Sequence, residues 1–154
     1  MKNKTIWSNR FKSKTSQSFQ KIGSSIHIDK RLYEQDIAAS IVHTQMLMKQ
    51  KIIKSEDGNK IINGLKKIKN LIDKGQFKFQ EKFEDIHLNI EKKLFEIIGP
   101  AAGFLHTARS RNDQVVTDFK LWVKKSSKEI LKDISLVMKN LIKKAEKNTD
   151  TVMP

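Results

Sequence analysis

The densest group of hydrogen-bonding side chains in this sequence is the stretch 105–114, which reads Leu-His-Thr-Ala-Arg-Ser-Arg-Asn-Asp-Gln. Nearly every side chain in it can donate or accept a directed hydrogen bond. It holds two of the four arginines of the chain, Arg109 and Arg111, although Lys carries most of the positive charge. Because an arginine can fix a carboxylate with two parallel hydrogen bonds, this composition favours binding of a carboxylate or a phosphate.

A long helix is predicted directly after these arginines. No Gly or Pro occurs from about residue 112 to residue 147, and apolar residues recur there at steps of three or four. This pattern predicts a single helix roughly 50 Å long. Backbone N–H groups at the start of such a helix attract anions, and the neutral amide of Asn112 could orient a bound ligand.

A purely structural interpretation of the same stretch stays open beside the anion site. In that interpretation the polar residues cap the helix, and Arg109 or Arg111 pairs with Asp113 or Asp118. The residue types alone are compatible with both interpretations.

Two further groups could contribute to a site. The segment 84–87, Glu-Asp-Ile-His, places acidic residues beside His87, which could serve in proton transfer or hydrogen bonding. The alternative is a helix-dipole pair of Glu84 and Asp85 with an incidental histidine. The segment 23–25, Gly-Ser-Ser, could present donors to an anion, or it could be a turn with a helix cap. The four histidines lack paired metal-binding spacing, and the absence of cysteine excludes thiolate ligands and disulfides.

The charge of the chain allows two classes of surface. A net charge of +14 and a pI near 9.9 are compatible with a nucleic-acid partner. However, the lysines recur singly or in pairs between apolar positions and form no long block, which favours solvated helix faces. No apolar run approaches the length of a membrane span, and the N-terminal residues lack the features of a secretory signal.

The elements that must position these residues are predicted to be helical throughout. The polar residues 1–21, with Trp7, Phe11 and Phe19, are expected to form an extended arm. Loops are expected over 76–83 and 101–107. Helices are predicted from near Lys30, capped by Asp29, to before Ser55; from Ser55 to near Lys74, ended by Gly75; and from Glu84 to Gly99.

The predicted helix over 112–147 is too long for one small domain to cover. Its apolar seam must meet helices from other subunits or from sequence outside this chain. We therefore expect an N-terminal fragment of a longer protein. Its parts would be an arm over 1–21, a helical domain over 22–111 and the start of a central helical bundle over 112–154.

Taken in order, four segments of the chain resemble the argininosuccinate lyase family of the fumarase/aspartase superfamily, which includes the delta-crystallins. They are 7–11 (Trp-Ser-Asn-Arg-Phe), the block formed by 25–29 and 32–37, 84–87 and 105–114, and the last is long and specific. The chain departs from the family pattern at Ser8 and Asn9, where the family has two glycines. It also departs at Phe104, where many members have Lys, and at Ala108, where Gly is frequent.

This resemblance implies an all-α fold and the reversible β-elimination of argininosuccinate to arginine and fumarate in arginine biosynthesis. It also implies a cytoplasmic homotetramer with composite active sites. The family positions that contact or adjoin the substrate correspond to Ser25, Asn112, Arg111, Asp85 and His87, and more weakly to Arg109 and Ser110.

The family's proposed acid and base segments lie outside this chain, so the fragment alone is expected to be inactive. No cofactor, metal, nucleic acid or membrane is expected to bind. The alternatives are another lyase of the superfamily that acts on a succinyl substrate, and a non-catalytic basic helical protein with a binding or structural role.

Overall fold

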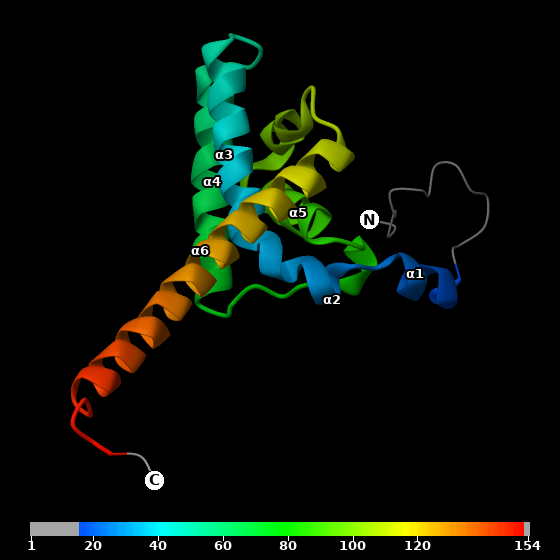
Figure 1. Cartoon of the computed structure of the whole chain (residues 1–154). Coiled ribbons are helices and arrows are strands. Elements are labelled where there is room, and N and C mark those ends of the chain that lie inside the picture. Colours follow the sequence, from blue (N-terminus) through cyan, green and yellow to red (C-terminus); the bar gives the residue numbers. More distant parts are fainter. Residues whose placement is uncertain (1–15, 153–154) are drawn as a thin grey trace. The chain divides into compact units, whose positions relative to one another are not determined.

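The computed structural model describes residues 16–152, and these residues form helices and connecting segments without a β-strand. This confirms the predicted all-α class. In chain order the elements are α1 (Gln17–Gly23), α2 (Ile26–Asp29), η1 (Lys30–Leu32), α3 (Tyr33–Lys49), α4 (Ser55–Asp73), η2 (Glu81–Phe83), α5 (Ile86–Ile98), η3 (Gly99–His106) and α6 (Arg111–Glu146), where η marks a 3-10 helix (Figure 1).

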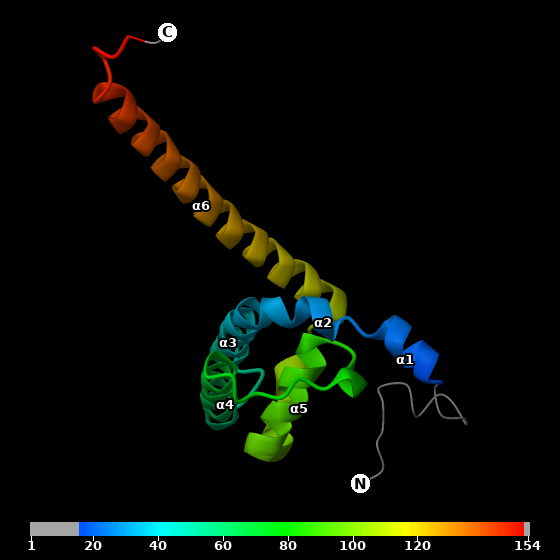
Figure 2. The same ribbon diagram turned by 90° about the horizontal axis from the view of Figure 1, so that it is seen from below.

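The chain divides into two compact units, Met1–Asp118 and Phe119–Pro154. In the first unit, α3 and α4 lie side by side as an antiparallel pair, and α5 and η3 pack against α4 (Figures 1 and 2). The first two turns of α6 belong to this unit. The predicted start of the central bundle at residue 112 lies at the start of α6, and the compact unit continues past it to Asp118.

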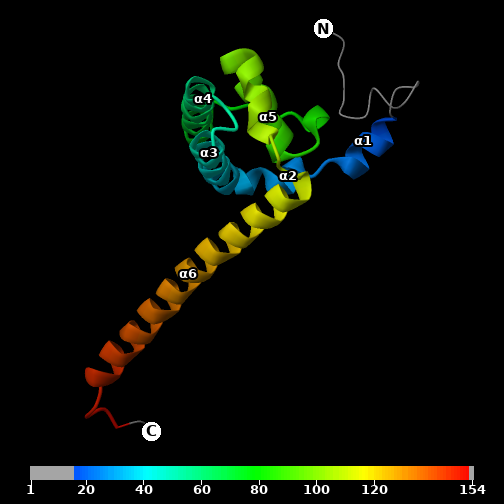
Figure 3. The same ribbon diagram turned by 90° about the horizontal axis from the view of Figure 1, so that it is seen from above.

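The core of the first unit is built mainly from aliphatic residues of α3, α4 and α5. Figure 3 shows the ribbons of these three helices from above. Burial of these side chains provides most of the stabilisation of a small helical unit. Gly64 allows α4 and α5 to approach closely, because a Cβ there would lie 2.5 Å from Leu94 Cδ1. The fully buried aliphatic residues are Ile37, Leu47, Ile61, Leu65, Ile68, Ile86, Ile90 and Leu94.

The helix ends at α4 and α5 follow the predicted caps. Gly75 has a φ of +67°, and its N–H donates to Ile72 O at 2.9 Å, while the N–H of Gln76 donates to Leu71 O at 2.8 Å. These two bonds form a glycine-terminated helix end. At the start of α5, Asp85 accepts a hydrogen bond from the N–H of Leu88 at 2.6 Å. The predicted helices from Ser55 and from residues 84–85 are therefore confirmed.

Three local predictions are wrong. Asp29 does not cap a helix starting at Lys30, because the chain there runs through α2, η1 and α3 in succession. Residues 101–107 are not a loop over most of their length, since η3 extends to His106. The extended conformation expected for 1–21 is wrong for 17–21, which lie in α1 behind the N-cap Ser16. Trp7 and Phe11 lie outside the described residues.

The second unit is dominated by the continuation of α6. The single long helix predicted over about 112–147 is confirmed as Arg111–Glu146. No described residue from Phe119 to Val152 is buried. The large apolar side chains exposed there are Phe119, Leu121, Val123, Ile130, Leu131, Ile134, Leu136, Val137, Met138, Leu141, Ile142 and Val152. Across residues 16–152, none of the helices combines the length and the apolar content that crossing a bilayer requires.

Candidate functional site

A buried group of polar side chains lies under the first two turns of α6. One oxygen of Asp36, Oδ1, accepts hydrogen bonds from His87 Nδ1 at 2.9 Å and from Gln114 Nε2 at 2.5 Å. Asp36, His87, Gln114 and Asp118 are all exposed by 5% or less. We call these four residues the buried polar cluster. It joins α3, α5 and α6 at a single carboxylate.

Asp36 and His87 form an ion pair within this cluster. Burial alone would raise the pKa of Asp36, but the hydrogen bond and the charge of His87, together with the hydrogen bond from Gln114 and the charge of Arg109, outweigh burial and lower that pKa. Burial alone would lower the pKa of His87, and the hydrogen bond and charge of Asp36 reverse this and raise it. An ionised Asp36 can only accept, so His87 Nδ1 carries the hydrogen between them.

Asp118 has no ordinary partner in the cluster. Its side chain is fully buried, and neither of its oxygens has a hydrogen-bond partner among the described residues. Its Oδ2 lies 3.6 Å from His87 Nδ1. Burial, followed by the negative charge of Asp36, raises the pKa of Asp118 to about 7. A neutral carboxyl group is therefore well populated at this position near neutral pH.

The segment before α6 is attached to α3 by two side-chain contacts. Arg109 Nη1 donates to Ser40 Oγ at 2.8 Å, and His43 Nε2 hydrogen-bonds with Thr107 O at 2.9 Å. Burial lowers the pKa of His43, so a neutral ring that donates to the carbonyl is favoured. Thr107 and Arg109 belong to the predicted anion-binding stretch 105–114, so these contacts attach its first half to α3.

Arg111 reaches from α6 to the start of α5. Its Nε lies 3.6 Å from Asp85 Oδ2, its Nη2 lies 3.5 Å from Glu91 Oε2, and its Nη1 donates to Gln114 Oε1 at 2.9 Å. The capping interpretation predicted that an arginine of this stretch pairs with Asp113 or Asp118. That pairing is wrong for Arg111, whose carboxylate partners are Asp85, the N-cap residue of α5, and Glu91 within α5.

Ser25 lies beside the same end of α5. The backbone N–H of Ser25 donates to Glu84 O at 2.8 Å, and its hydroxyl donates to Asp29 Oδ2 at 2.6 Å. Asp29 Oδ1 in turn accepts from the N–H of Ile86 at 3.2 Å. The start of α2 and the start of α5 are therefore joined next to Asp85.

The predicted site residues differ in burial: some are exposed at the surface, and one is buried. Asp85 and Arg111 are in contact, and Asn112 and Ser110 are exposed at the start of α6, where the N–H of Asn112 donates to Ser110 Oγ at 3.3 Å. His87 lies beneath them and is only 2% exposed. In this structure the His87 side chain therefore contacts the buried Asp36 and does not face the solvent.

Sequence reasoning missed Asp36, Gln114 and Asp118 as members of this group. Gln114 and Asp118 are four positions apart, so on a helix they share one face, and this signal was available. Asp36 follows from no local signal. Its partner His87 is 51 positions away in the sequence, and only the packing of α3 against α5 brings the two together.

Asp36, His87 and Asp118 each offer one possible metal-ligand atom, and these atoms lie within 4.8 Å of one another. Carboxylate and imidazole groups are common zinc ligands. A ligating nitrogen must be free of hydrogen, whereas His87 Nδ1 uses its hydrogen in the 2.9 Å bond to Asp36. The arrangement of Asp36, His87 and Asp118 is therefore better explained by hydrogen bonds between these side chains than by coordination of a metal ion.

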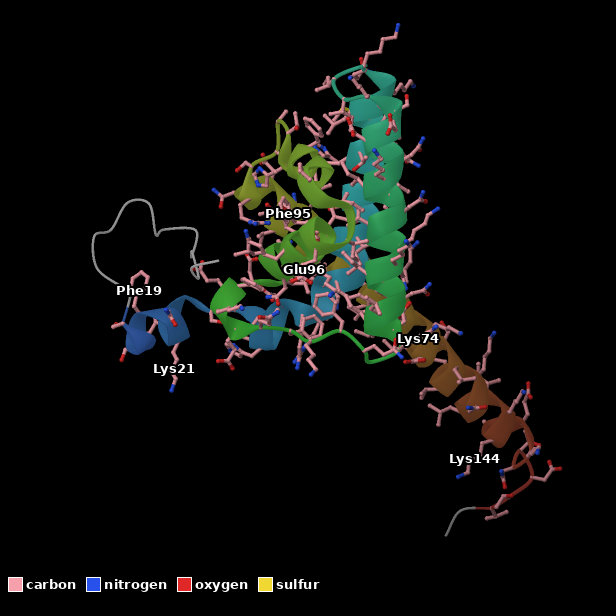
Figure 4. The ribbon with its side chains drawn as sticks, turned by 180° about the vertical axis from the view of Figure 1, so that it is seen from behind. Phe19, Lys21, Lys74, Phe95, Glu96 and Lys144 are labelled. Atoms are coloured by element: carbon pink, nitrogen blue, oxygen red, sulfur yellow. The ribbon has the colours of Figure 1, made fainter. Side chains whose placement is uncertain are left out.

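A surface pocket of about 260 Å³ includes none of the four cluster residues in its described lining. Glu96, labelled in Figure 4, is part of its lining. The buried Asn89 in its wall is satisfied, because its amide nitrogen donates to Gln80 O and Asp85 O and its oxygen accepts from the N–H of Gln80. No unpaired buried polar side chain among the described lining residues therefore points to a ligand there.

Comparison with known proteins identifies the family. A family model described as lyase matches residues 9–154. The chain is 53% identical to the argininosuccinate lyase of Pelagibacter ubique (strain HTCC1062), over 99% of this chain and 33% of the relative. It is 49% identical to that of Ehrlichia canis (strain Jake), over 100% of this chain and 32% of the relative. It is 46% identical to the argininosuccinate lyase of Bartonella bacilliformis, over 97% of this chain and 32% of the relative.

The chain spans about a third of the length of these curated relatives. The match with the family model covers nearly all of the sequence, including the motifs at 25–29, 32–37, 84–87 and 105–114. The chain belongs to this lyase family.

Proposed function

We propose that this chain is part of an argininosuccinate lyase and that it supplies substrate-binding residues to an active site completed by other segments. The observation that carries the proposal is the identity of 46–53% to proteins of that name along almost the whole chain. In that reaction a proton leaves a carbon beside a carboxylate, and the guanidinium group of arginine is then expelled as fumarate forms.

The start of α6 suits the charge that this reaction develops. Loss of the proton places extra negative charge on the neighbouring carboxylate, which fixed donors stabilise. Ser110 and Asn112 lie exposed at the helix start, where backbone N–H groups and the helix dipole favour an anion. In this proposal the amide of Asn112 holds the substrate carboxylate, and Arg111 supplies positive charge beside it.

The remaining predicted residues orient this group. Asp85 and Glu91 hold Arg111 at 3.6 and 3.5 Å, so the guanidinium is directed without being fully neutralised by a close bidentate pair. Ser25 presents its exposed side chain beside the start of α5. Arg109 fastens the preceding segment to α3, and His87 supports the start of α5 from below. The proton-transfer groups come from other segments.

The assembled enzyme in this proposal is a cytoplasmic homotetramer with composite active sites, and it binds neither nucleic acid nor membranes. Residues 22–111 form its N-terminal helical domain, and residues from 112 onward begin its central bundle. The exposed apolar side chains along α6 after Asp118 support this assembly, since an exposed apolar surface of this extent is typical of an association face.

The test is fumarate release from argininosuccinate by the full-length protein that contains this chain. We expect release by the full-length assembly and none by residues 1–154 alone. A panel of other succinyl compounds should give weaker turnover. No fumarate from the correctly assembled full-length protein, or faster turnover of another succinyl substrate, would contradict the proposal.

A further inference from the structure

The buried polar cluster contains more acceptors than ordinary donors. Both oxygens of Asp118 are buried without a hydrogen-bond partner among the described residues, and Oδ2 lies 3.6 Å from His87 Nδ1. One oxygen each of Asp36 and Asp118 and one ring nitrogen of His87 lie within 4.8 Å of one another. A buried ionised carboxylate without a hydrogen bond is strongly unfavourable. Two buried carboxyl groups at this separation avoid the cost when one of them keeps a proton.

We propose that Asp36 and Asp118 hold one proton between them, and that this pair is a positioning element that fixes Gln114, and through Gln114 the guanidinium of Arg111, at the start of α6. The O–H of Asp118 then donates to Asp36. This supplies the hydrogen bond that Asp118 otherwise lacks. Asp36 becomes the common acceptor for His87, Gln114 and Asp118, which is within the capacity of one carboxylate.

The contact path from this pair to the surface has two links. Gln114 donates through Nε2 to Asp36 at 2.5 Å and accepts through Oε1 from Arg111 Nη1 at 2.9 Å. Both ends of the amide are therefore used, and its orientation is fixed by Asp36. A second negative charge on Asp118 would be placed beside Asp36 and would disturb this common acceptor. Asp36 and Asp118 thereby control where the charge of Arg111 lies.

The other charged groups around the pair do not remove the need for a proton. Arg109 precedes α6 and acts favourably on both carboxylates, but its hydrogen bond goes to Ser40. From α5, His87 donates to Asp36, lies 3.6 Å from Asp118 Oδ2 and lowers the pKa of Asp118, but burial and the charge of Asp36 outweigh this effect. The charge of His87 also interacts with Asp85 and Arg111. The raised pKa of Asp118, at about 7, agrees with a proton retained by burial and by the charge of Asp36.

The first experiment detects the proton directly and does not depend on activity. Difference infrared spectroscopy of the full-length protein, with aspartate labelled by carbon-13, should show the carbonyl band of a protonated carboxyl group. Asp118→Asn should remove this band, and raising the pH of the wild type through about 7 should remove it as well. The matched control is Asp113→Asn, an exposed carboxylate on the same part of α6, which should leave the band in place.

The second experiment tests the positioning role, and this part rests on the proposed lyase activity. As the pH rises through about 7, KM for argininosuccinate should rise in the wild type, and Asp118→Asn should lose this dependence, because its amide keeps a donor at all pH values. Asp118→Leu stays neutral but has no donor, and its KM should rise about tenfold, with a smaller change in kcat. A merely structural role would lower the amount of folded enzyme and leave KM unchanged.

Two results would overturn the inference. One is a wild-type spectrum without a carboxyl band, or with a band that Asp118→Asn leaves in place. The other is an identical pH profile of KM in wild type and Asp118→Asn. If the wild-type assembly released no fumarate, the proposed function would fail, whereas the infrared band would still report on the shared proton.

Discussion

The first two turns of α6 and the later part of the same helix differ in which kind of side chain is buried. In the first two turns the buried residues are polar, Gln114 and Asp118, and apolar Val115 and Val116 are exposed. From Phe119 onward no described residue is buried, although the apolar spacing continues. One helical pattern thus serves two purposes. In the proposed function, the buried polar side chains position the substrate-binding residues, and the exposed apolar side chains form a surface for association.

The largest expected effect is at Asp36. Replacing it by Ala leaves His87 and Gln114 buried without their common acceptor, so the free energy of unfolding should fall by about 3–5 kcal/mol. Urea denaturation measures this change. Asp113→Ala, at an exposed position of α6, is the control and should leave the midpoint nearly unchanged. Equal destabilisation by the two variants would contradict the prediction that the buried Asp36 contributes more to stability than the exposed Asp113.

A second large effect is expected on turnover alone. Asn112→Ala in the full-length protein should lower kcat by roughly 100-fold, as loss of one charge-stabilising donor does, because Asn112 is exposed and free to face a ligand. The melting temperature should change little. The capping interpretation makes the opposite prediction, namely a clear drop in melting temperature with intact kinetics.

The charge state of Asp118 should make stability depend on pH. Its folded pKa of about 7 lies above the ordinary value of about 4, so the folded state holds a proton that the unfolded state has lost in this window. This contribution is fully present below about pH 4 and is lost as the pH rises through about 7. Its slope is at most about 1.4 kcal/mol per pH unit.

Asp118→Asn should remove this loss, so its free energy of unfolding should vary less with pH over that window than that of the wild type. Asp36 contributes with the opposite sign. Its lowered pKa gives stability that is lost in more acidic solution, so the two carboxyl groups can be separated by the direction of their pH dependence. Superimposable stability profiles for wild type and Asp118→Asn would count against a neutral Asp118.

A smaller effect is expected at Ala108, which lies within the polar stretch 105–114. Its φ of +54° lies in the left-handed region, where an L side chain costs about 1–2 kcal/mol. Glycine removes this cost but loses more chain entropy on folding, so Ala108→Gly should stabilise the chain by about 0.5–1 kcal/mol. Thermal unfolding should show a higher melting temperature, and a lower one would contradict this account.

The smallest effect is expected in the later part of α6. Ile134 is 51% exposed, so Ile134→Ser should change the stability of the isolated chain by less than about 0.5 kcal/mol. In the full-length protein the same substitution should weaken assembly, which sedimentation velocity measures. Lys132→Ser, at an exposed charged position two residues earlier, is the matched control for assembly.

Local sequence signals predicted the helices whose ends carry their own caps. The N-cap Asp85 and the glycine end at Gly75 fix α5 and α4, and uninterrupted apolar spacing fixes α6. The short helices near Asp29 were not predicted, since Asp29 uses its side chain for Ser25 and for the start of α5. A residue type that can cap a helix is visible in the sequence. The sequence does not show that a distant residue binds the same side chain and so prevents capping.

For the candidate site, the sequence named the exposed residues, whose substrate-binding role stays a prediction, and it did not indicate the buried side chains that contact them. Asp85 and Arg111 lie in contact, but nothing local to either of them indicates the other. The frequent Gly at the position of Ala108 in the family indicates an unusual backbone conformation there. The sequence alone does not show that this conformation is a positive φ. The Asp36–His87 pair depends on packing of α3 against α5 and therefore required the structure.

The central claim is that the polar start of α6 holds a substrate carboxylate. It is tested most directly by fumarate release from argininosuccinate, measured for the full-length protein with Asn112 intact and with Asn112→Ala. We predict clear release by the first and roughly 100-fold slower release by the second at equal folded concentration. Equal rates for the two proteins would contradict the claim.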